Sequence, residues 1–182
     1  MNKEKQMDWN ARGRELADAA SKAFDELNSA LAGEKLYAIC LQTADDGMSV
    51  GFCANTEEGY AEKRASEAEF EEMTSGYEAY LRWAPAEWRY EMFGDAHFMD
   101  VNRDLSAAAL NPKETFDVHF ERLIEVMIEA LAKLRAERGA ALGGITLFVT
   151  ISDSEDAEAV ERRSAMRLNT PEQASAFLER FG

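Results

Sequence analysis

Apolar residues recur every three or four positions in several stretches of the chain, which is the spacing of one face of an α-helix. The pattern covers residues 8–31 and is strongest over residues 114–138, where Phe116, Phe120, Leu123 and Leu131 share one stripe. Shorter helical patterns cover residues 57–78 and 96–110, and two more follow Ser152 and Thr170. We therefore predict a largely helical chain in which the segment 114–138 is the central packing helix.

Three short apolar runs have the character of strands instead. Residues 36–42 and 48–54 flank the turn sequence Asp45-Asp46-Gly47, which predicts a β-hairpin over residues 36–54. Residues 145–151 form an almost unbroken β-branched and aromatic run, typical of a buried strand. The pattern predicts one α+β domain over residues 1–182, with a small, mainly antiparallel sheet (hairpin 36–54 plus strand 145–151) covered by helices.

The predicted hairpin also bears on the two cysteines. A turn centred on Asp46 places Cys40 opposite Phe52 rather than opposite Cys53. We therefore expect two buried free thiols and no cross-strand disulfide, in keeping with a chain that shows no secretory signal.

The net charge of the chain argues against some classes of function. The chain has 35 acidic and 20 basic residues, a formal net charge of −15, which argues against a module that neutralises nucleic-acid phosphates. Its apolar content of 46% is that of a folded protein. No window has the roughly 18 apolar residues of a membrane span, and residues 1–15 lack the apolar stretch of a signal peptide. We expect a cytoplasmic protein with no membrane and no direct nucleic-acid contact.

Signatures of catalysis and metal binding are missing from the sequence. There is no G-x-S-x-G elbow, no P-loop, and no G-x-G-x-x-G following a strand. Of the two histidines, His119 lies within the predicted central helix, where a satisfied structural role is expected, and His97 lies among acids as a solvated loop residue. We predict no catalytic residue, no metal site and no cofactor.

The acidic segment 57–78 carries eight acidic and two basic residues. Two interpretations stay open: a solvated helix face, or a docking surface for a basic protein partner, whose association such a surface accelerates. The candidate docking residues are Glu57, Glu58, Glu67, Glu69, Glu71 and Glu72.

An aromatic segment at residues 80–94 holds two of the three tryptophans. Pro85 suits the first turn of a helix, which would place Trp88 and Met92 on its inward face. One interpretation is an anchor in the core. The other is a ligand pocket walled by Trp83 and Trp88, with Glu87 as acid or base and Arg167 as an anion anchor.

Three stretches together carry a resemblance: LYAICLQTADDGMSVGFCANTEEG, YLRWAPAEWRYE and ITLFVTISDSEDAEAVERRSAMRLN. In this order and spacing they resemble the bacterial domain-of-unknown-function 4303 family. The matching positions are Asn55, Thr56, Glu57, Glu58, Trp83, Pro85, Glu87, Trp88, Ser152, Asp153, Arg167, Leu168 and Asn169. The resemblance spans about residues 10–181 and implies a shared fold, but it brings no catalytic residues.

The sequence therefore favours a non-enzymatic acidic interaction protein. Our specific hypothesis is a bacterial immunity protein that blocks a basic, nucleic-acid-directed toxin by presenting carboxylates where phosphates would bind. The alternative is a small-ligand-binding protein or enzyme with its pocket around the Trp83–Trp88 segment. The sequence sets no oligomeric state.

Overall fold

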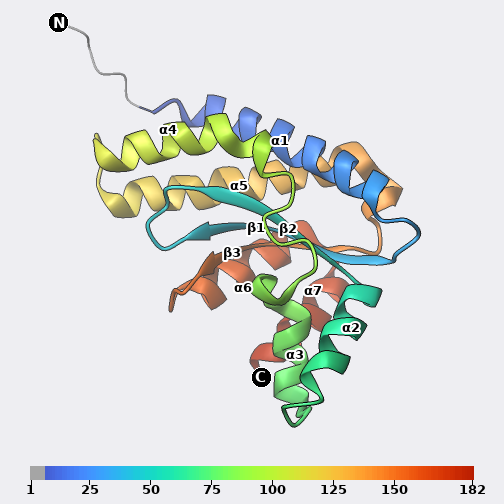
Figure 1. The fold of residues 1–182 in the computed structure, drawn as a ribbon. Helices are drawn as coiled ribbons and strands as arrows, with labels where there is room; N and C mark the ends of the chain where they lie inside the picture. Colours follow the sequence, from blue (N-terminus) through green and yellow to red (C-terminus); the bar gives the residue numbers. More distant parts are fainter. Residues whose placement is uncertain (1–6) are drawn as a thin grey trace, which may run out of the picture.

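The computed structural model describes residues 7–182 and shows a three-stranded sheet with helices on both faces (Figure 1). The predicted α+β class is confirmed. The helices and strands follow in the order α1 (Trp9–Ala30), β1 (Leu36–Ala44), β2 (Val50–Thr56), α2 (Glu57–Glu67), α3 (Ser75–Trp83), α4 (Met99–Leu110), α5 (Phe116–Arg138), β3 (Thr146–Ser152), α6 (Ala157–Leu168) and α7 (Pro171–Leu178). Short 3₁₀ segments are η1 (Pro85–Glu87), η2 (Asp95–Phe98), η3 (Gly139–Leu142) and η4 (Glu179–Phe181).

The sheet has the order β2-β1-β3, and its pairing is mixed. β1 and β2 form the predicted antiparallel hairpin, whereas β3 lies parallel to β1, so the sheet is not mainly antiparallel. Parallel neighbours need a long connection that returns the chain to the same end of the sheet. Here the connection from β2 to β3 includes α5, which packs against β3.

The register of the hairpin differs by one residue from the prediction. Cys40 lies opposite Cys53, not opposite Phe52, because the pairing is centred between Asp46 and Gly47 rather than on Asp46. Both cysteines are free and buried. Burial raises the pKa of the Cys40 thiol, which keeps it protonated and unreactive.

The two faces of the sheet are covered by different helices. Ile39 and Leu41 point into a core built with α1, α4 and α5, whereas Ala38 and Cys40 point into a second cluster built with α6, α7 and Trp88. Figure 1 shows α1, α4 and α5 on one side of the strands and α6 and α7 on the other. Because both faces are buried, the strands are nearly continuous apolar runs.

The central helix is confirmed, but its first turn is not part of the core. Leu123 and Leu131 are fully buried, as the stripe predicted, whereas Phe116 is 53% exposed. Thr115 caps the helix by accepting a hydrogen bond from the amide of Val118. The start of α5 therefore faces a surface hollow and not the sheet.

The acidic segment forms two helices instead of one. α2 ends at Glu67 and α3 begins at Ser75, where the side chain of Thr74 caps the new helix by accepting from the amide of Tyr77. The two helices lie side by side and project from the sheet on the side away from α1, α4 and α5 (Figure 1). We call α2, α3 and the linking residues 68–74 the acidic arm.

The helix predicted from Pro85 does not extend to Met92. Only the short η1 forms, and Trp88 follows it with extended backbone. Met92 has a φ of 49° and does not share a helical face with Trp88. Instead the chain runs beside β2, where Tyr90 and Ala54 exchange backbone hydrogen bonds at 3.2 and 2.9 Å. Within residues 7–182, no helix has both the length and the apolar character needed to cross a membrane.

Candidate functional site

Half of the predicted docking residues, all of them on α2, are engaged in internal contacts. Glu57 accepts two hydrogen bonds from Arg82 at 2.9 and 3.0 Å, and Glu67 pairs with Lys63 at 2.7 Å. These cations lower the pKa of both carboxyls. Glu58 accepts a hydrogen bond from the backbone amide of Lys35 at 2.8 Å. The three glutamates therefore hold the arm to itself and to the sheet.

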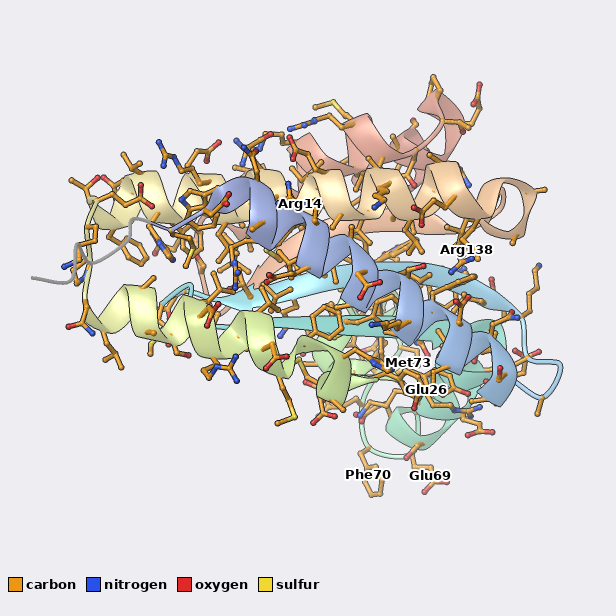
Figure 2. All side chains as sticks on the ribbon, turned by 90° about the horizontal axis from the view of Figure 1, so that it is seen from above. Arg14, Glu26, Glu69, Phe70, Met73 and Arg138 are labelled. Atoms are coloured by element: carbon orange, nitrogen blue, oxygen red, sulfur yellow. The ribbon has the colours of Figure 1, made fainter. Side chains whose placement is uncertain are left out.

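The tip of the arm is different. We define the arm tip as residues 69–72, where Glu69, Glu71 and Glu72 flank Phe70 in the sequence. Phe70 is 80% exposed, and Figure 2 shows Phe70 and Glu69 pointing outward from the end of the arm. Across residues 7–182, no side-chain hydrogen bond or ion pair is found for these three glutamates. The arm tip therefore presents an exposed aromatic ring and, next to it in sequence, three carboxylates that have no partner among the described residues.

The backbone of the arm tip is nonetheless fixed. The amides of Phe70 and Glu71 both donate to the carbonyl of Glu67 at 2.9 Å, continuing the turn in which α2 ends. The side chains are thus displayed from a defined turn, and a partner would order less chain on binding than it would with an unstructured loop.

The two tryptophans of the aromatic segment join the arm to the sheet. Trp88 is buried, and its indole N–H donates to the carbonyl of Arg82 at 3.0 Å. Its ring meets Phe148 of β3 edge-on, with centroids 5.8 Å apart. Trp83 makes the same kind of contact with Phe177 of α7 at 4.9 Å. These contacts fit the interpretation of a core anchor.

Glu87 and Arg167, which the pocket interpretation placed together, have separate partners. Glu87 pairs with Lys63 at 2.8 Å and accepts from the Tyr80 hydroxyl at 2.9 Å, within the arm. Arg167 of α6 donates to both oxygens of Glu125 of α5, each at 2.8 Å. Their contacts have no residue in common, so the structure does not bring the two charges to one site.

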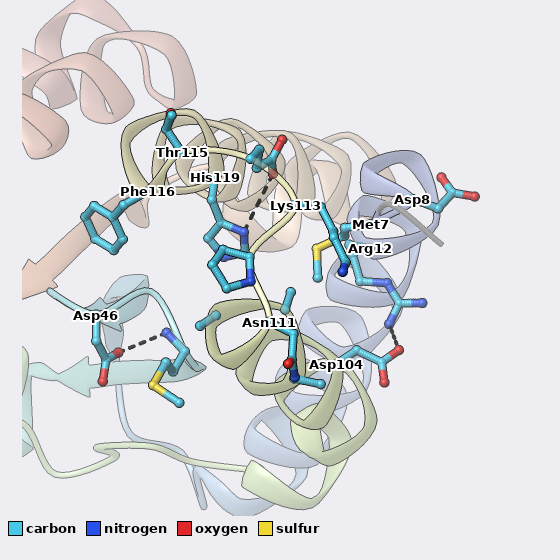
Figure 3. Close-up of a pocket in the computed structure, with 16 residues that line it drawn as sticks. Met7, Asp8, Arg12, Asp46, Asp104, Asn111, Lys113, Thr115, Phe116 and His119 are labelled. Carbon is cyan, nitrogen blue, oxygen red and sulfur yellow. Dashed lines mark hydrogen bonds and ion pairs between the residues drawn. The ribbon is translucent and has the colours of Figure 1, made fainter. Parts of the chain in front are cut away.

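A cleft of about 1040 Å³ lies elsewhere, between the start of α1, the end of α4, the start of α5 and the turn of the hairpin (Figure 3). None of the candidate residues predicted from the sequence lines it. The cleft is lined by Met7, Asp8, Arg12, Asp46, Met48, Asp104, Ala107, Ala108, Ala109, Asn111, Pro112, Lys113, Glu114, Thr115, Phe116 and His119.

His119 is the most unusual residue of this cleft. It is 7% exposed, and its ring packs edge-on against Trp9 with centroids 5.0 Å apart. Nδ1 lies 3.7 Å from a carboxylate oxygen of Glu114. Nε2 is buried and has no hydrogen-bond partner among residues 7–182. The prediction of a satisfied structural histidine is therefore confirmed for burial and wrong for Nε2.

Glu114 is itself held from both sides. One carboxylate oxygen accepts from the indole N–H of Trp9 at 3.0 Å, and the other accepts from Arg122 at 3.0 Å. The carboxylate is thereby fixed near the imidazole, although the distance of 3.7 Å from Nδ1 is too long for a hydrogen bond. Sequence reasoning missed this trio because Trp9 and Glu114 are 105 positions apart.

His97 and Asp46, the latter from the turn of the hairpin, make ordinary local contacts. His97 lies 2.8 Å from Glu26 of α1, and Asp46 accepts from the amide of Met48 at 2.9 Å within the hairpin turn. In the part of the chain that the structure describes, no group of three or more His, Cys, Asp or Glu side chains is placed to hold a metal ion.

The fold and these sites define a small α+β protein with a projecting acidic arm and a separate surface cleft. The family model "Domain of unknown function (DUF4303)" matches residues 16–170, and the chain belongs to this family, as the resemblance predicted. No curated protein and no solved structure matches the chain. The family's description assigns no activity, so function has to be argued from the sites themselves.

Proposed function

We propose that the chain is an acidic interaction protein that binds a basic protein partner through the arm tip. One observation carries the proposal: among the described residues, Phe70 is the most exposed large apolar side chain, and its three acidic neighbours have no hydrogen-bond or ion-pair partner. Burial of an exposed aromatic ring in a partner removes a large apolar surface from water and so favours association.

The two components of the arm tip contribute differently. Burial of the Phe70 ring in a partner supplies about 2 kcal/mol of affinity. The carboxylates of Glu69, Glu71 and Glu72 mainly steer the encounter and select against acidic partners. The formal net charge of −15 adds a long-range field of the same sign. The proposal therefore requires a partner with an apolar pocket rimmed by Lys or Arg.

We propose further that this partner is a toxin directed at nucleic acid and that the chain is a bacterial immunity protein. A toxin of this class needs a basic surface for phosphates, and the carboxylates of the arm tip would occupy that surface. The two buried free thiols fit the cytoplasm, where such an inhibitor would act. In this proposal, the acidic arm supplies the negative charge that blocks the toxin.

Capture of the partner tests the proposal. A tagged chain is used to isolate bound proteins from the native host, next to a variant with Glu69, Glu71 and Glu72 changed to Lys. The matched control changes Glu129, Glu155 and Glu172, three exposed acids on other elements, to Lys. We expect the wild type and the control to retain one basic protein that the arm-tip variant loses.

The immunity role has its own test. The captured protein is expressed in a heterologous cell with each form of the chain. We expect growth arrest that the wild type and the control relieve and the arm-tip variant does not. A partner that is acidic, or that is retained equally by all three forms, would refute docking through the arm tip. A basic partner that causes no growth arrest would refute only the immunity role.

A further inference from the structure

Met92 fills the space that a side chain at position 51 would occupy. A Cβ atom on Gly51 would overlap with Sδ and Cε of Met92 and would lie 3.6 Å from its Cγ. Met92 is nevertheless 40% exposed, so the residue lies between the sheet and the solvent. Its φ of 49° is in the left-handed region, which a non-glycine residue adopts only where its surroundings hold it there. Gly51 therefore forms a seat for the Met92 thioether.

The thiol of Cys53 lies beside this seat. Gly51 and Cys53 are alternate residues of β2, so their side-chain positions share one face of the sheet, about 7 Å apart. The backbone amide of Met92 donates to Sγ of Cys53 at 3.4 Å. Met92 thus contacts the thiol through its backbone and covers the neighbouring position on the same face with its side chain.

The main chain on both sides of Met92 is fixed to β2. Tyr90 exchanges two backbone hydrogen bonds with Ala54, and the amide of Phe93 donates to the carbonyl of Phe52 at 2.7 Å. The side chain of Met92 is unbranched and has three rotatable bonds. It can therefore leave Gly51 while the main chain stays on the edge of the sheet.

Cys53 is the more reactive of the two thiols. Cys40 lies directly opposite on β1, and a hydrogen bond from its thiol lowers the pKa of the Cys53 thiol below its usual value, with a further contribution from the Met92 amide. A lower pKa favours the thiolate, which is the reactive form of cysteine. Cys53 has no exposed surface, so lack of access is what protects it.

We propose that Met92 is an oxidation site for peroxides and that its sulfoxide uncovers the Cys53 thiol. The Met92 sulfur bonds to one oxygen atom of hydrogen peroxide, the O–O bond breaks, and water is released; the sulfur loses two electrons and the peroxide gains them. The sulfoxide is polar and larger than the thioether, so it turns from Gly51 to the solvent. The proposal does not rest on the proposed function, because these residues lie outside the arm tip.

Alkylation of the folded chain with iodoacetamide tests the proposal. The chain is treated with hydrogen peroxide, reduced with dithiothreitol, which restores thiols and leaves the sulfoxide, and freed of both reagents before alkylation. Mass spectrometry then identifies each modified residue. We expect a sulfoxide at Met92 and alkylation of Cys53 at least about tenfold faster than in the untreated chain. Cys40 should react more slowly than Cys53, because burial raises the pKa of its thiol.

Met92→Leu keeps an apolar cover that peroxide does not oxidise. We expect its Cys53 to alkylate at the same slow rate with and without peroxide. Met99→Leu is the matched control, since it removes a methionine of α4 that is 68% exposed, and it should retain the full response of the wild type. Thermal melting of each variant, and of the oxidised wild type, establishes that the chain is folded.

Two variants test the seat without any oxidant. Gly51→Ala displaces the far end of the Met92 side chain, and Met92→Gln replaces the thioether by a polar group of similar length. We expect both to speed alkylation of Cys53 at least about tenfold without peroxide. If Gly51→Ala does not fold, the result with Met92→Gln decides.

Several results would overturn the proposal. One is a wild-type chain that forms no sulfoxide at Met92 or that alkylates Cys53 no faster after peroxide. Another is an equal peroxide response in Met92→Leu, or slow alkylation in the folded variants that displace the thioether. Equal acceleration at Cys40 and Cys53, with loss of the melting transition, would show that peroxide unfolds the chain and would also overturn it.

Discussion

In the cleft, Glu114 accepts hydrogen bonds from Trp9 and Arg122, whereas Glu69 and Glu71 at the arm tip have no such partners among the described residues. Both regions are rich in acids, yet the carboxylate in the cleft is fixed by two donors, and the arm tip exposes its carboxylates next in sequence to an exposed aromatic ring. The two regions differ in which group is left without a partner. A carboxylate with partners inside the chain has a structural role, whereas an exposed carboxylate without them is a candidate for binding a partner, and acidic composition alone does not separate the two.

The same distinction divides the acidic arm. Near its base, Glu57 is fixed by Arg82, while at its end Phe70 and its neighbours contribute little to internal contacts. Substitutions at the base should therefore change stability, and substitutions at the arm tip should change binding. The following predictions test this separation, beginning with the largest expected effect.

Trp88→Ala should have the largest effect on stability. It removes a buried indole that packs on Phe148 and donates to the carbonyl of Arg82, so we expect the free energy of unfolding to fall by about 3–5 kcal/mol. Urea unfolding measures it, with Trp88→Phe as the milder control. A loss below about 1 kcal/mol would show that the aromatic segment is not an anchor.

Glu114→Gln tests the cleft side of the comparison. The substitution removes the charge that Arg122 and the Trp9 indole share, and we expect a loss of about 2 kcal/mol. Glu71→Gln is the matched change at the arm tip and should leave stability within about 0.5 kcal/mol of the wild type. Similar losses for both variants would remove the distinction between the two kinds of carboxylate.

Because of Glu57, the free energy of unfolding should depend on pH. Hydrogen bonds from Arg82 lower the pKa of the Glu57 carboxyl in the folded chain, so the folded state releases this proton more readily than the unfolded state. The resulting stabilisation is present above the unfolded pKa of about 4.3 and is lost as pH falls through the lower folded pKa.

The carboxylate of Glu57 is partly exposed, so the gain is small. Glu57→Gln should lower the free energy of unfolding by about 0.5 kcal/mol near neutral pH. The difference from the wild type should shrink as pH falls below about 4. Denaturant titrations at several pH values measure it. A difference that grows toward acid pH would mean that the sign of the coupling is wrong.

The arm-tip variant, with Glu69, Glu71 and Glu72 changed to Lys, should have the smallest effect on stability. Among residues 7–182 these side chains have no hydrogen bond or ion pair to lose, so thermal or urea unfolding should place the variant within about 0.5 kcal/mol of the wild type. A gain in stability of a similar size is also consistent, because net repulsion decreases. A loss above about 1.5 kcal/mol would mean that the arm tip has a structural role.

Much of the fold was predictable because local pattern and burial agree. The hairpin, the strand at residues 145–151 and α5 follow from period and composition alone. The parallel pairing of β3 did not, since the choice of neighbouring strand depends on contacts between distant segments. The break in the acidic segment was also missed, because residues 68–74 contain neither Gly nor Pro to mark it.

The candidate sites were predictable only in part. Charge pointed to the acidic segment, but only the structure separates Glu57, which is paired, from Glu71, which is not. The cleft gave no local signal at all. It depends on Trp9 at the start of α1, on His119 of α5 and on Glu114 just before α5, and Trp9 and Glu114 are 105 positions apart in the sequence.

The most direct test of the central claim is titration of the purified basic partner against three forms of the chain. The wild type, the arm-tip lysine variant and the control changed at Glu129, Glu155 and Glu172 are compared at about 50 mM and about 500 mM salt. The last two carry the same net charge, so any difference between them reports position. We predict that the arm-tip variant binds at least about 100-fold more weakly than the wild type at low salt and that the control stays within about threefold. Equal weakening of both variants would show that only the overall charge matters and would contradict docking through the arm tip.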